Sequence, residues 1–191
     1  CALALGTPAS ILAGVAQAAR NGVLVKGGVH LENLGRLKAI AFDKTGTITH
    51  GRPEVTDVVK LPNPNDQIPN EDALLALAAG IESRSGHPLA QAVVRAAQGK
   101  RLALPTIGDV ESLTGRGLHS TVGGRTIVIG NLKLMAESNI TLADDGRAHV
   151  ERLQGEGKTI MLAAVNGKLA GVIGVADTLR PGAAPTMTAL K

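Results

Sequence analysis

Five consecutive residues have the side chains and the flexibility that phosphoryl chemistry requires: Asp43, Lys44, Thr45, Gly46 and Thr47. They follow a largely apolar run, residues 37–42, which predicts a buried strand. A carboxylate at the end of such a strand is placed to attack a phosphoryl group and form an aspartyl-phosphate. The threonine hydroxyls and loop amides can hold phosphate oxygens, and the glycine lets the backbone approach closely. A simple turn would explain a lone Asp-x-x-Gly, but the longer string 42–49 is more specific.

The composition indicates a folded protein with an aliphatic core. Of the 191 residues, 44% are hydrophobic, yet the chain has one Phe and no Trp or Tyr. The core must therefore be built from Ala, Val, Ile and Leu, and the length suits one domain or two small ones. The net charge of +4 is modest and the basic residues are dispersed. Without a basic stripe or stacking aromatic residues, nucleic-acid binding is not expected.

The start of the chain is apolar. Residues 1–19 carry no charged side chain, and this length approaches the roughly 20 apolar residues that span a bilayer. A buried helix of a soluble domain explains the run equally well, and Pro8 interrupts a simple span. The single cysteine, Cys1, excludes an internal disulfide framework. The lack of an initiating Met and of a basic leader predicts no cleavable signal peptide, and we expect a piece of a longer chain.

Turn and capping residues divide the first half of the chain into helices and loops. Helices are expected at four places: residues 13–20, 29–34, 70–81 and 88–98. Asn70 is placed to cap the third helix, and Pro88 suits the first turn of the fourth. The Pro- and Asn-rich residues 63–70 mark a loop or linker between the second helix and the third.

A different pattern follows, in which short apolar or alternating segments are separated by glycines. It predicts strands at residues 110–113, 117–122, 126–130, 159–165 and 169–175, with helices at 132–138 and 143–154. The last two strands are joined through Asn166-Gly167, a strong hairpin signal. We therefore expect an antiparallel sheet with helices over residues 54–174, inserted into a unit that the strand at 37–42 begins.

Two motifs place charged or polar side chains at the ends of elements. Glu82 and His87-Pro88 flank a helix N-terminus, whose free amides and dipole favour an anionic ligand. The plainer alternative is a capped helix with a histidine at the surface. Asp177 and Arg180 follow the last predicted strand, where a solvated turn before a helix is the plainer alternative.

Two glycine motifs could approach a phosphate, although each is weak alone. Gly115-x-Gly117 and Gly130-Asn131 lie at strand ends, where glycines usually serve turns. The Lys-Thr pair at 158–159 lacks the upstream glycine spacing of a phosphate-binding loop, so we interpret it as structural. Because each motif is weak alone, a function can be assigned to these residues only from their order and spacing along the chain.

Taken in order, the motifs resemble those of the heavy-metal-transporting P-type ATPases over nearly the whole chain. The string 42–49 is similar to that family's phosphorylation motif, and Cys1-Ala2-Leu3 with Thr7-Pro8 resembles the end of its Cys/Ser-Pro-Cys membrane motif. Residues 177–181 resemble the return into the phosphorylation domain. The residues that match the nucleotide-domain signature are Glu82, His87, Pro88, Gly115, Gly117, Gly130 and Asn131.

The resemblance implies an ATP-dependent metal pump. ATP would bind the antiparallel domain and transfer its γ-phosphate to Asp43, with Lys44, Thr45 and Thr47 in the catalytic loop. The resemblance also implies Mg²⁺, held by Asp43 and the backbone carbonyl of Thr45, because phosphoryl transfer requires such a cation. The Cys1 thiolate would be a candidate ligand for the transported soft cation. The implied parent is a multi-pass protein in contact with membrane lipid, with its catalytic portion in the cytoplasm.

The implied fold class is mixed α/β (α+β). It comprises part of a haloacid-dehalogenase-like parallel-sheet phosphorylation domain with an inserted antiparallel-sheet nucleotide-binding domain, preceded by a partial membrane helix. The expected divisions are residues 1–20 (partial transmembrane helix), 21–53 (start of the phosphorylation domain), 54–174 (nucleotide-binding domain) and 175–191 (return into the phosphorylation domain). The family's Thr-Gly-Glu, Thr-Gly-Asp and Gly-Asp-Gly motifs are absent from this sequence. We therefore expect the chain alone to bind ATP weakly and not to turn over.

Two other functions fit part of the sequence. A soluble phosphatase of the haloacid-dehalogenase type would share the Asp43 nucleophile, but such enzymes usually place a second Asp two residues later, where this chain has Thr45. A non-catalytic nucleotide-binding module would need only the later motifs. For the transported metal, the resemblance at residues 28–32 favours zinc, cadmium or cobalt over copper.

Overall fold

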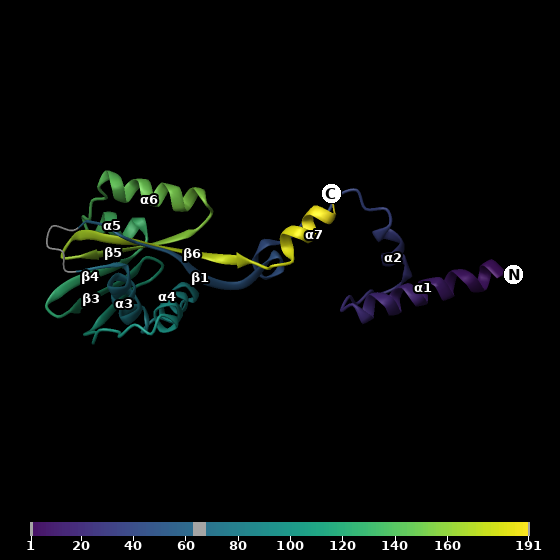
Figure 1. The fold of residues 1–191 in the computed structure, drawn as a ribbon, viewed down its shortest axis with the longest axis horizontal. Helices are drawn as coiled ribbons and strands as arrows, with labels where there is room; N and C mark the ends of the chain where they lie inside the picture. The colour runs from purple at the N-terminus through teal and green to yellow at the C-terminus, as the bar shows by residue number, and fades with distance from the viewer. Residues whose placement is uncertain (1, 63–67, 191) are drawn as a thin grey trace. The chain divides into compact units, whose positions relative to one another are not determined.

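The computed structural model describes residues 2–62 and 68–190, and Figure 1 shows its fold. The chain divides after Phe42 into two units. In the described residues the first unit is helical, and the second is an antiparallel sheet with helices. Cys1, the expected cation ligand, lies outside the described residues.

The first unit consists of the helices α1 (Ala2–Arg20) and α2 (Gly28–Leu34), so the expected ends at residues 20 and 34 are confirmed. The two helices pack closely where a glycine replaces a side chain, because a Cβ on Gly14 would lie 2.6 Å from a carbon of Leu31. A partial membrane helix was expected over residues 1–20. Within the described part of the chain, no helix is long and apolar enough to cross a membrane.

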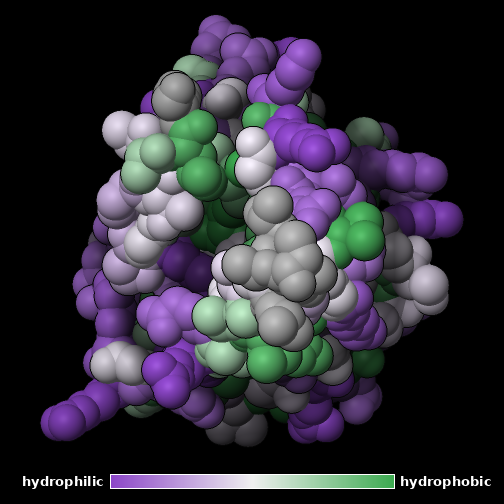
Figure 2. All heavy atoms as spheres, turned by 90° about the vertical axis from the view of Figure 1, so that its right-hand side faces the viewer, coloured by the Kyte–Doolittle hydropathy of each residue, from purple (hydrophilic) through white to green (hydrophobic). Residues whose placement is uncertain are grey.

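The buried strand expected at residues 37–42 is wrong. The segment has no regular secondary structure, and Leu37, Ile40 and Phe42 are exposed. A strand needs a neighbour to pair its N–H and C=O groups, and every strand pairing among the described residues lies in the sheet of the second unit. The apolar side chains of this segment therefore remain exposed. In the view of Figure 2, hydrophobic residues of the molecule, in green, lie at the surface among hydrophilic ones, in purple.

The second unit is built on a six-stranded sheet with the order β1-β6-β5-β4-β3-β2, in which every pairing is antiparallel. The strands are β1 (Thr49–Lys60), β2 (Val110–Leu113), β3 (Gly117–Val122), β4 (Arg125–Gly130), β5 (Thr159–Val165) and β6 (Lys168–Leu179). The five predicted strands are confirmed, although β6 extends four residues beyond its predicted end. The hairpin is also confirmed, because Asn166 and Gly167 both have positive φ angles, 49° and 75°, as a two-residue turn of this kind requires.

Strand β1 was not predicted. Its alternation is interrupted by a register shift between Val55 and Asp57 and by the neighbouring pair Val58-Val59, so the period-2 signal is weak. β1 pairs with β6 along its whole length, from Thr49 opposite Leu179 to Lys60 opposite Gly171. Only the part of β6 up to Val175 also pairs with β5. Beyond that point β1 and β6 form a two-stranded ribbon that extends from the sheet (Figure 1).

Helices cover both faces of the sheet (Figure 1). α3 (Glu71–Glu82) and α4 (Pro88–Gly99) lie on one face, and α5 (Leu132–Glu137) and α6 (Asp144–Gly155) on the other, while α7 (Ala183–Ala189) follows β6. The predicted cap is present, since Asn70 accepts a hydrogen bond of 2.9 Å from the Ala73 amide. The helices α3 to α6 confirm the predicted positions to within about one residue, whereas no bounds were predicted for α7.

The core is divided by the sheet into two clusters. On β5, Met161, Ala163 and Val165 face the cluster beneath α3 and α4, whereas Leu162 and Ala164 face the cluster beneath α5 and α6. This alternation is the period-2 geometry of a strand whose two faces are both buried. The central strands are thereby held rigidly by the core, and they can position side chains at the edge of the sheet.

The close packing of β1 and α3 against β6 predicts a stability effect at Gly171. A Cβ there would lie 2.2 Å from Leu74 Cδ2 and 2.6 Å from the Val59 carbonyl oxygen. Because the backbone oxygen cannot move away without breaking the ladder, Gly171→Ala should lower the free energy of unfolding by at least about 1–3 kcal/mol. Urea unfolding followed by circular dichroism measures the difference.

Gly155→Ala is the matched control. Gly155 ends α6 and has open space around its Cβ position, so this substitution should be neutral or stabilising by up to about 1 kcal/mol. Equal stabilities of the two variants would show that the strands around Gly171 can accept a Cβ without cost.

Candidate functional site

The Asp43 loop lies at the end of the β1–β6 ribbon. Lys44–Ile48 form a tight turn directly before β1, and Gly46 has a φ of +80°, a conformation that favours glycine. The side chains of Asp43, Lys44, Thr45 and Thr47 are all exposed. The turn therefore presents the predicted nucleophile and its neighbours outward.

Thr49 holds this turn from behind. It is fully buried, and its hydroxyl accepts a hydrogen bond from the Gly46 amide at 3.1 Å. The same oxygen lies 3.0 Å from the Lys44 carbonyl and in hydrogen-bond contact with the Asp177 carboxylate. A hydroxyl has a single proton to donate, and the charged acceptor makes the stronger bond. Thr49 thus joins the turn to a residue 128 positions away.

Asp177 and Arg180 also hold the Asp43 turn in place through hydrogen bonds. Asp177 also accepts hydrogen bonds from the Gly51 and Arg52 amides, each at 3.1 Å. The hydrogen bond from Thr49, followed by these two, holds the pKa of the Asp177 carboxyl below its usual range. The Arg180 Nε donates to the Thr49 carbonyl at 3.0 Å, and its Nη2 donates to the Gly46 carbonyl at 3.2 Å. Asp177 and Arg180 therefore bind the Asp43 turn, and the exposed turn at residues 181–182 before α7 agrees with the plainer interpretation as well.

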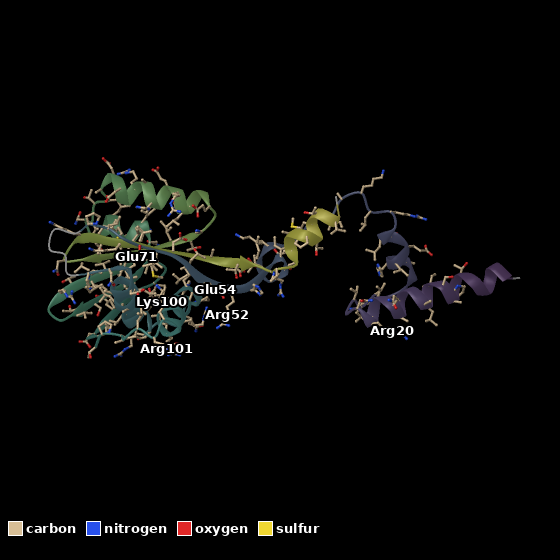
Figure 3. All side chains as sticks on the ribbon, in the orientation of Figure 1. Arg20, Arg52, Glu54, Glu71, Lys100 and Arg101 are labelled. Atoms are coloured by element: carbon tan, nitrogen blue, oxygen red, sulfur yellow. The ribbon has the colours of Figure 1, made fainter. Side chains whose placement is uncertain are left out.

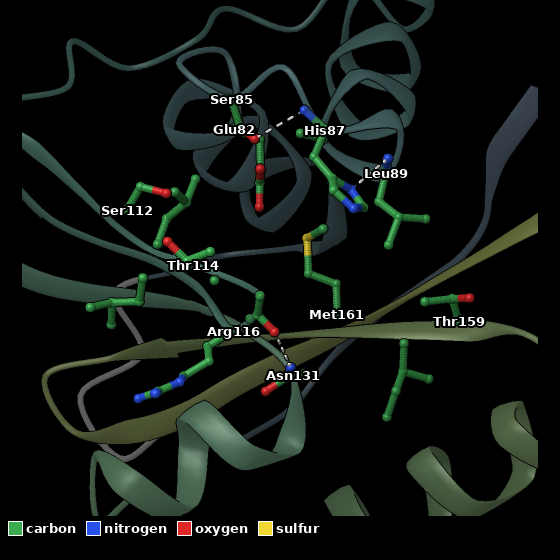
Figure 4. Close-up of a pocket in the computed structure, with 17 residues that line it drawn as sticks. Glu82, Ser85, His87, Leu89, Ser112, Thr114, Arg116, Asn131, Thr159 and Met161 are labelled. Atoms are coloured by element: carbon green, nitrogen blue, oxygen red, sulfur yellow. Dashed lines mark hydrogen bonds between the residues drawn. The ribbon is translucent and has the colours of Figure 1, made fainter.

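A cavity of about 450 Å³ lies between α3, α4 and the strands β3, β4 and β5. Seventeen residues line it, and Figure 4 shows how they surround it. They include six of the seven residues predicted from the nucleotide-domain signature: Glu82, His87, Gly115, Gly117, Gly130 and Asn131. The seventh, Pro88, is not a lining residue and instead occupies the first turn of α4, with the fixed backbone that suits this position.

His87 is oriented by the start of α4. Its Nδ1 accepts a hydrogen bond of 3.2 Å from the Leu89 amide, so the imidazole proton must lie on Nε2. The ring lines the cavity (Figure 4) and offers this Nε2–H as a donor. The histidine is therefore both the helix cap and a polar group of the cavity, which unites the two alternatives that the sequence left open.

Glu82 is the buried acid of the cavity. The last residue of α3, it is 5% exposed, and burial raises the pKa of its carboxyl to about 7. At neutral pH the group is therefore divided between a hydrogen-bond donor and an anionic acceptor. Such a shift in a cavity marks a candidate binding residue.

The glycines form an edge of the cavity where two strands approach closely. A Cβ on Gly117, whose φ is +150°, would lie 2.0 Å from the Ile129 carbonyl oxygen, and a Cβ on Gly130 would lie 2.2 Å from the Arg116 carbonyl oxygen. No other residue fits either position without moving the backbone. The close approach of β3 and β4 therefore requires glycine at both positions.

Asn131 stabilises the backbone at this edge of the cavity through two hydrogen bonds. Its Oδ1 accepts from the Leu134 amide at 3.0 Å, and its Nδ2 donates to the Gly115 carbonyl at 3.1 Å. Both ends of the side-chain amide are thus used to cap α5 and to hold the turn before Gly117. The residue shapes the cavity, and its own polar groups are already paired.

Some residues of the site were missed by the sequence interpretation. Thr159 and Met161 line the cavity from β5. The Lys-Thr pair was considered structural, which holds for Lys158, since its ammonium lies 2.6 Å from both Asp57 and Glu156. Thr49 was part of the quoted string but was given no role. Only its contact with Asp177 reveals that role.

The buried acid predicts how stability depends on pH. The folded pKa of Glu82 is about 7 against an ordinary value of 4.5, so the unfolded chain loses this proton first and stability falls as the pH rises between these values. Glu82→Gln should therefore stabilise the chain by up to about 3 kcal/mol at pH 8 and change it little at pH 4. Urea unfolding at the two pH values measures the difference.

Glu151→Gln, on the exposed part of α6, controls for the loss of a carboxylate at the surface and should change stability little at either pH. If Glu82→Gln and the wild type were equally stable at pH 8, the Glu82 carboxyl would not be desolvated in the folded chain.

Comparison with known proteins places these features in a family. The sequence model of the haloacid dehalogenase-like hydrolase family matches residues 37–191. A manganese-exporting P-type ATPase of Mycobacterium tuberculosis is 40% identical over 191 residues, which are the whole of this chain and 26% of that protein. A copper-exporting P-type ATPase of Bacillus subtilis is also 40% identical, over the whole of this chain and 23% of its own length.

A solved structure agrees with the sequence relatives. A zinc-transporting PIB-type ATPase in its E2·Pi state matches with a TM-score of 0.86 at 40% identity, covering 100% of this chain and 30% of that chain. The chain thus spans about a quarter of the length of the curated relatives it matches. It belongs to the haloacid dehalogenase-like hydrolase family, and its homologues over its whole length are heavy-metal P-type ATPases.

Proposed function

We propose that the chain is the ATP-binding and phosphorylation region of a heavy-metal-exporting P-type ATPase. The observation that carries the proposal is the convergence of six signature residues in one cavity, three from α3, β3 and β4 and three from the turns and helix caps beside them. Its size is within the range of small-molecule sites, about 300–1,000 Å³. In the same unit, Thr49 of β1 with Asp177 and Arg180 at the end of β6 holds the Asp43 turn. One module would bind the nucleotide and the other would receive its phosphoryl group.

The proposed reaction is transfer of the γ-phosphoryl group of ATP to Asp43. A carboxylate oxygen of Asp43 attacks the γ-phosphorus, the bond to the bridging oxygen of ADP breaks, and an aspartyl-phosphate forms. Thr45 and Thr47 flank the nucleophile in the exposed turn, where their hydroxyls and amides would hold phosphoryl oxygens. Because Thr45 stands where a phosphatase would have its second Asp, this chain lacks the group that would hydrolyse the intermediate quickly. That difference favours a pump over a soluble phosphatase.

Mg²⁺ is the proposed cofactor of the transfer. When bound, it would neutralise charge on the phosphate oxygens, and the atoms proposed to hold it are the Asp43 carboxylate and the Thr45 carbonyl. Among the described residues, no group of three or more His, Cys, Asp or Glu side chains could hold a metal by itself. This donor set fits Mg²⁺, which usually takes most of its ligands from phosphates and water.

The parent protein would act in a membrane, with this region on the cytoplasmic side and lipid around its membrane helices. The proposed cargo is a heavy-metal cation. The names of the relatives include manganese, copper and zinc exporters, so the preference for zinc, cadmium or cobalt remains a prediction from residues 28–32. A cation role for Cys1 likewise remains a prediction.

Removing the His87 imidazole should weaken ATP binding. His87→Ala deletes the Nε2–H donor at the cavity, and the loss of one such hydrogen bond predicts roughly tenfold weaker binding. Isothermal titration calorimetry of the 191-residue chain with ATP measures this. His149→Ala, a matched change on α6 outside the cavity, should bind like the wild type. Equal weakening by both variants would exclude a specific role for the cavity.

Asp43 should carry the phosphoryl group in the full-length protein that contains this sequence. Incubation with ATP radiolabelled at the γ-phosphate should leave acid-stable, hydroxylamine-labile label on the wild type. Asp43→Asn should abolish the label, because an amide cannot act as the nucleophile, whereas Asp109→Asn, at another exposed aspartate, should retain it. Label that persists in Asp43→Asn would contradict the proposed nucleophile.

A further inference from the structure

The cavity offers a nucleobase a single aromatic ring, the imidazole of His87. The chain contains one Phe and no Trp or Tyr, and Phe42 belongs to the other unit. Apart from that imidazole, the apolar surface open to a base comes from aliphatic or sulfur-containing side chains. Those that line it are Leu89, Ala90, Leu113, Leu118, Ile160 and Met161.

Met161 stands out among them by its position and direction. It lies on the central strand β5 and is 8% exposed, so most of its surface is packed in the core beneath α3 and α4. Figure 4 shows its side chain extending from β5 toward His87 and Glu82, with the sulfur directed to the same side of the cavity. The polar groups and the sulfur thus face one space.

The space beside Met161 lies where β4 ends and β5 continues without a β4 partner. β4 ends at Gly130, which pairs with Leu162 of β5. The chain then turns away at Asn131 into α5, so β5 continues to Met161 and Thr159 without a β4 partner. Thr159, Ile160 and Met161 of β5 therefore line the cavity at the place where β4 ends.

We propose that the Met161 thioether is the platform on which the purine ring of the nucleotide rests, and that it helps to set the base preference of the site. The proposal depends on the proposed nucleotide-binding function. A polarisable thioether makes favourable contacts with aromatic rings, and the three rotatable bonds of methionine let it follow the ring. In this contact the base would supply the aromatic face and Met161 the sulfur.

The neighbouring polar groups complete the recognition of the base. Glu82 and the Nε2–H of His87 border the same space, so they can bind polar groups at the ring edge while Met161 contacts the ring face. A purine presents a larger face than a pyrimidine, and the contact should therefore favour ATP over CTP. Loss of the sulfur should reduce this preference, whereas a residue with only a structural role would affect both nucleotides equally.

Methyl NMR tests the contact directly. The chain has three methionines, so protein labelled with ¹³C in the methionine methyl groups gives three signals. The proposal requires that ATP shift the Met161 signal by the ring current of the base and that inorganic tripolyphosphate not do so. Met135, buried on the opposite face of the sheet, and Met187, on α7, serve as internal references. Met161→Leu and Met187→Leu assign the signals.

The outcomes separate the two proposals. If ATP shifts the amide signals of Gly117 and Gly130 but leaves the Met161 methyl unmoved, the platform is overturned and nucleotide binding stands. If ATP moves neither, the proposed nucleotide site fails, and this inference fails with it.

Substitution measures the contribution to affinity. Met161→Leu keeps the volume and removes the sulfur, and it should weaken ATP binding about two- to threefold. Met161→Ala also removes the apolar surface and should weaken it about five- to tenfold. Both should lower the ratio of ATP to CTP affinity, while Met187→Leu should leave it unchanged. Wild-type affinities and ratios in Met161→Leu and in a folded Met161→Ala would overturn the proposal.

Discussion

The hydrogen bond between the Thr49 hydroxyl and the Asp177 carboxylate connects the places where the chain enters and leaves the antiparallel sheet. The two residues are 128 positions apart, and the bond adjoins the turn that presents Asp43. The Gly46 amide, the Gly51 amide and the Arg52 amide all converge on this pair. An unpaired buried hydroxyl or an unpaired carboxylate would cost free energy, so the geometry of the turn is fixed by groups on the paired strands β1 and β6, which are far apart in the chain.

The cavity depends on a second constraint, the close approach of β3 and β4. Gly117 and Gly130 leave no room for a Cβ, and Asn131 uses both ends of its amide within the protein. Recognition of a ligand is thereby left to backbone groups at this edge and to the side chains on the other walls. Of those, Glu82 has lost most of its hydration by burial, which makes it the acid in the cavity whose charge responds to what binds beside it.

The two sites share one scaffold. The β1–β6 ribbon runs from the sheet that forms the cavity to the turn that carries Asp43 (Figure 1). Charged side chains also brace the sheet at Asp57, Lys158 and Glu156, and Figure 3 shows many more charged groups over the surface of the unit. The network around Lys158 is half-shielded from water, while most exposed pairs contribute little to stability. The core of small aliphatic residues therefore provides most of the rigidity that both sites need.

The sequence by itself determined the elements whose signals are local. Asn70 caps α3, Pro88 starts α4 and Asn166-Gly167 turns the hairpin, because capping, a fixed φ and positive φ angles depend on neighbouring residues alone. It also identified the Asp43 string and six residues of the cavity, through their order along the chain. Tertiary structure decided the rest. Residues 37–42 have no described strand to pair with, Thr49 acquires its role from Asp177, and Met161 faces the cavity because β4 ends before it. These outcomes depend on atoms far apart in the chain, and no local pattern encodes them.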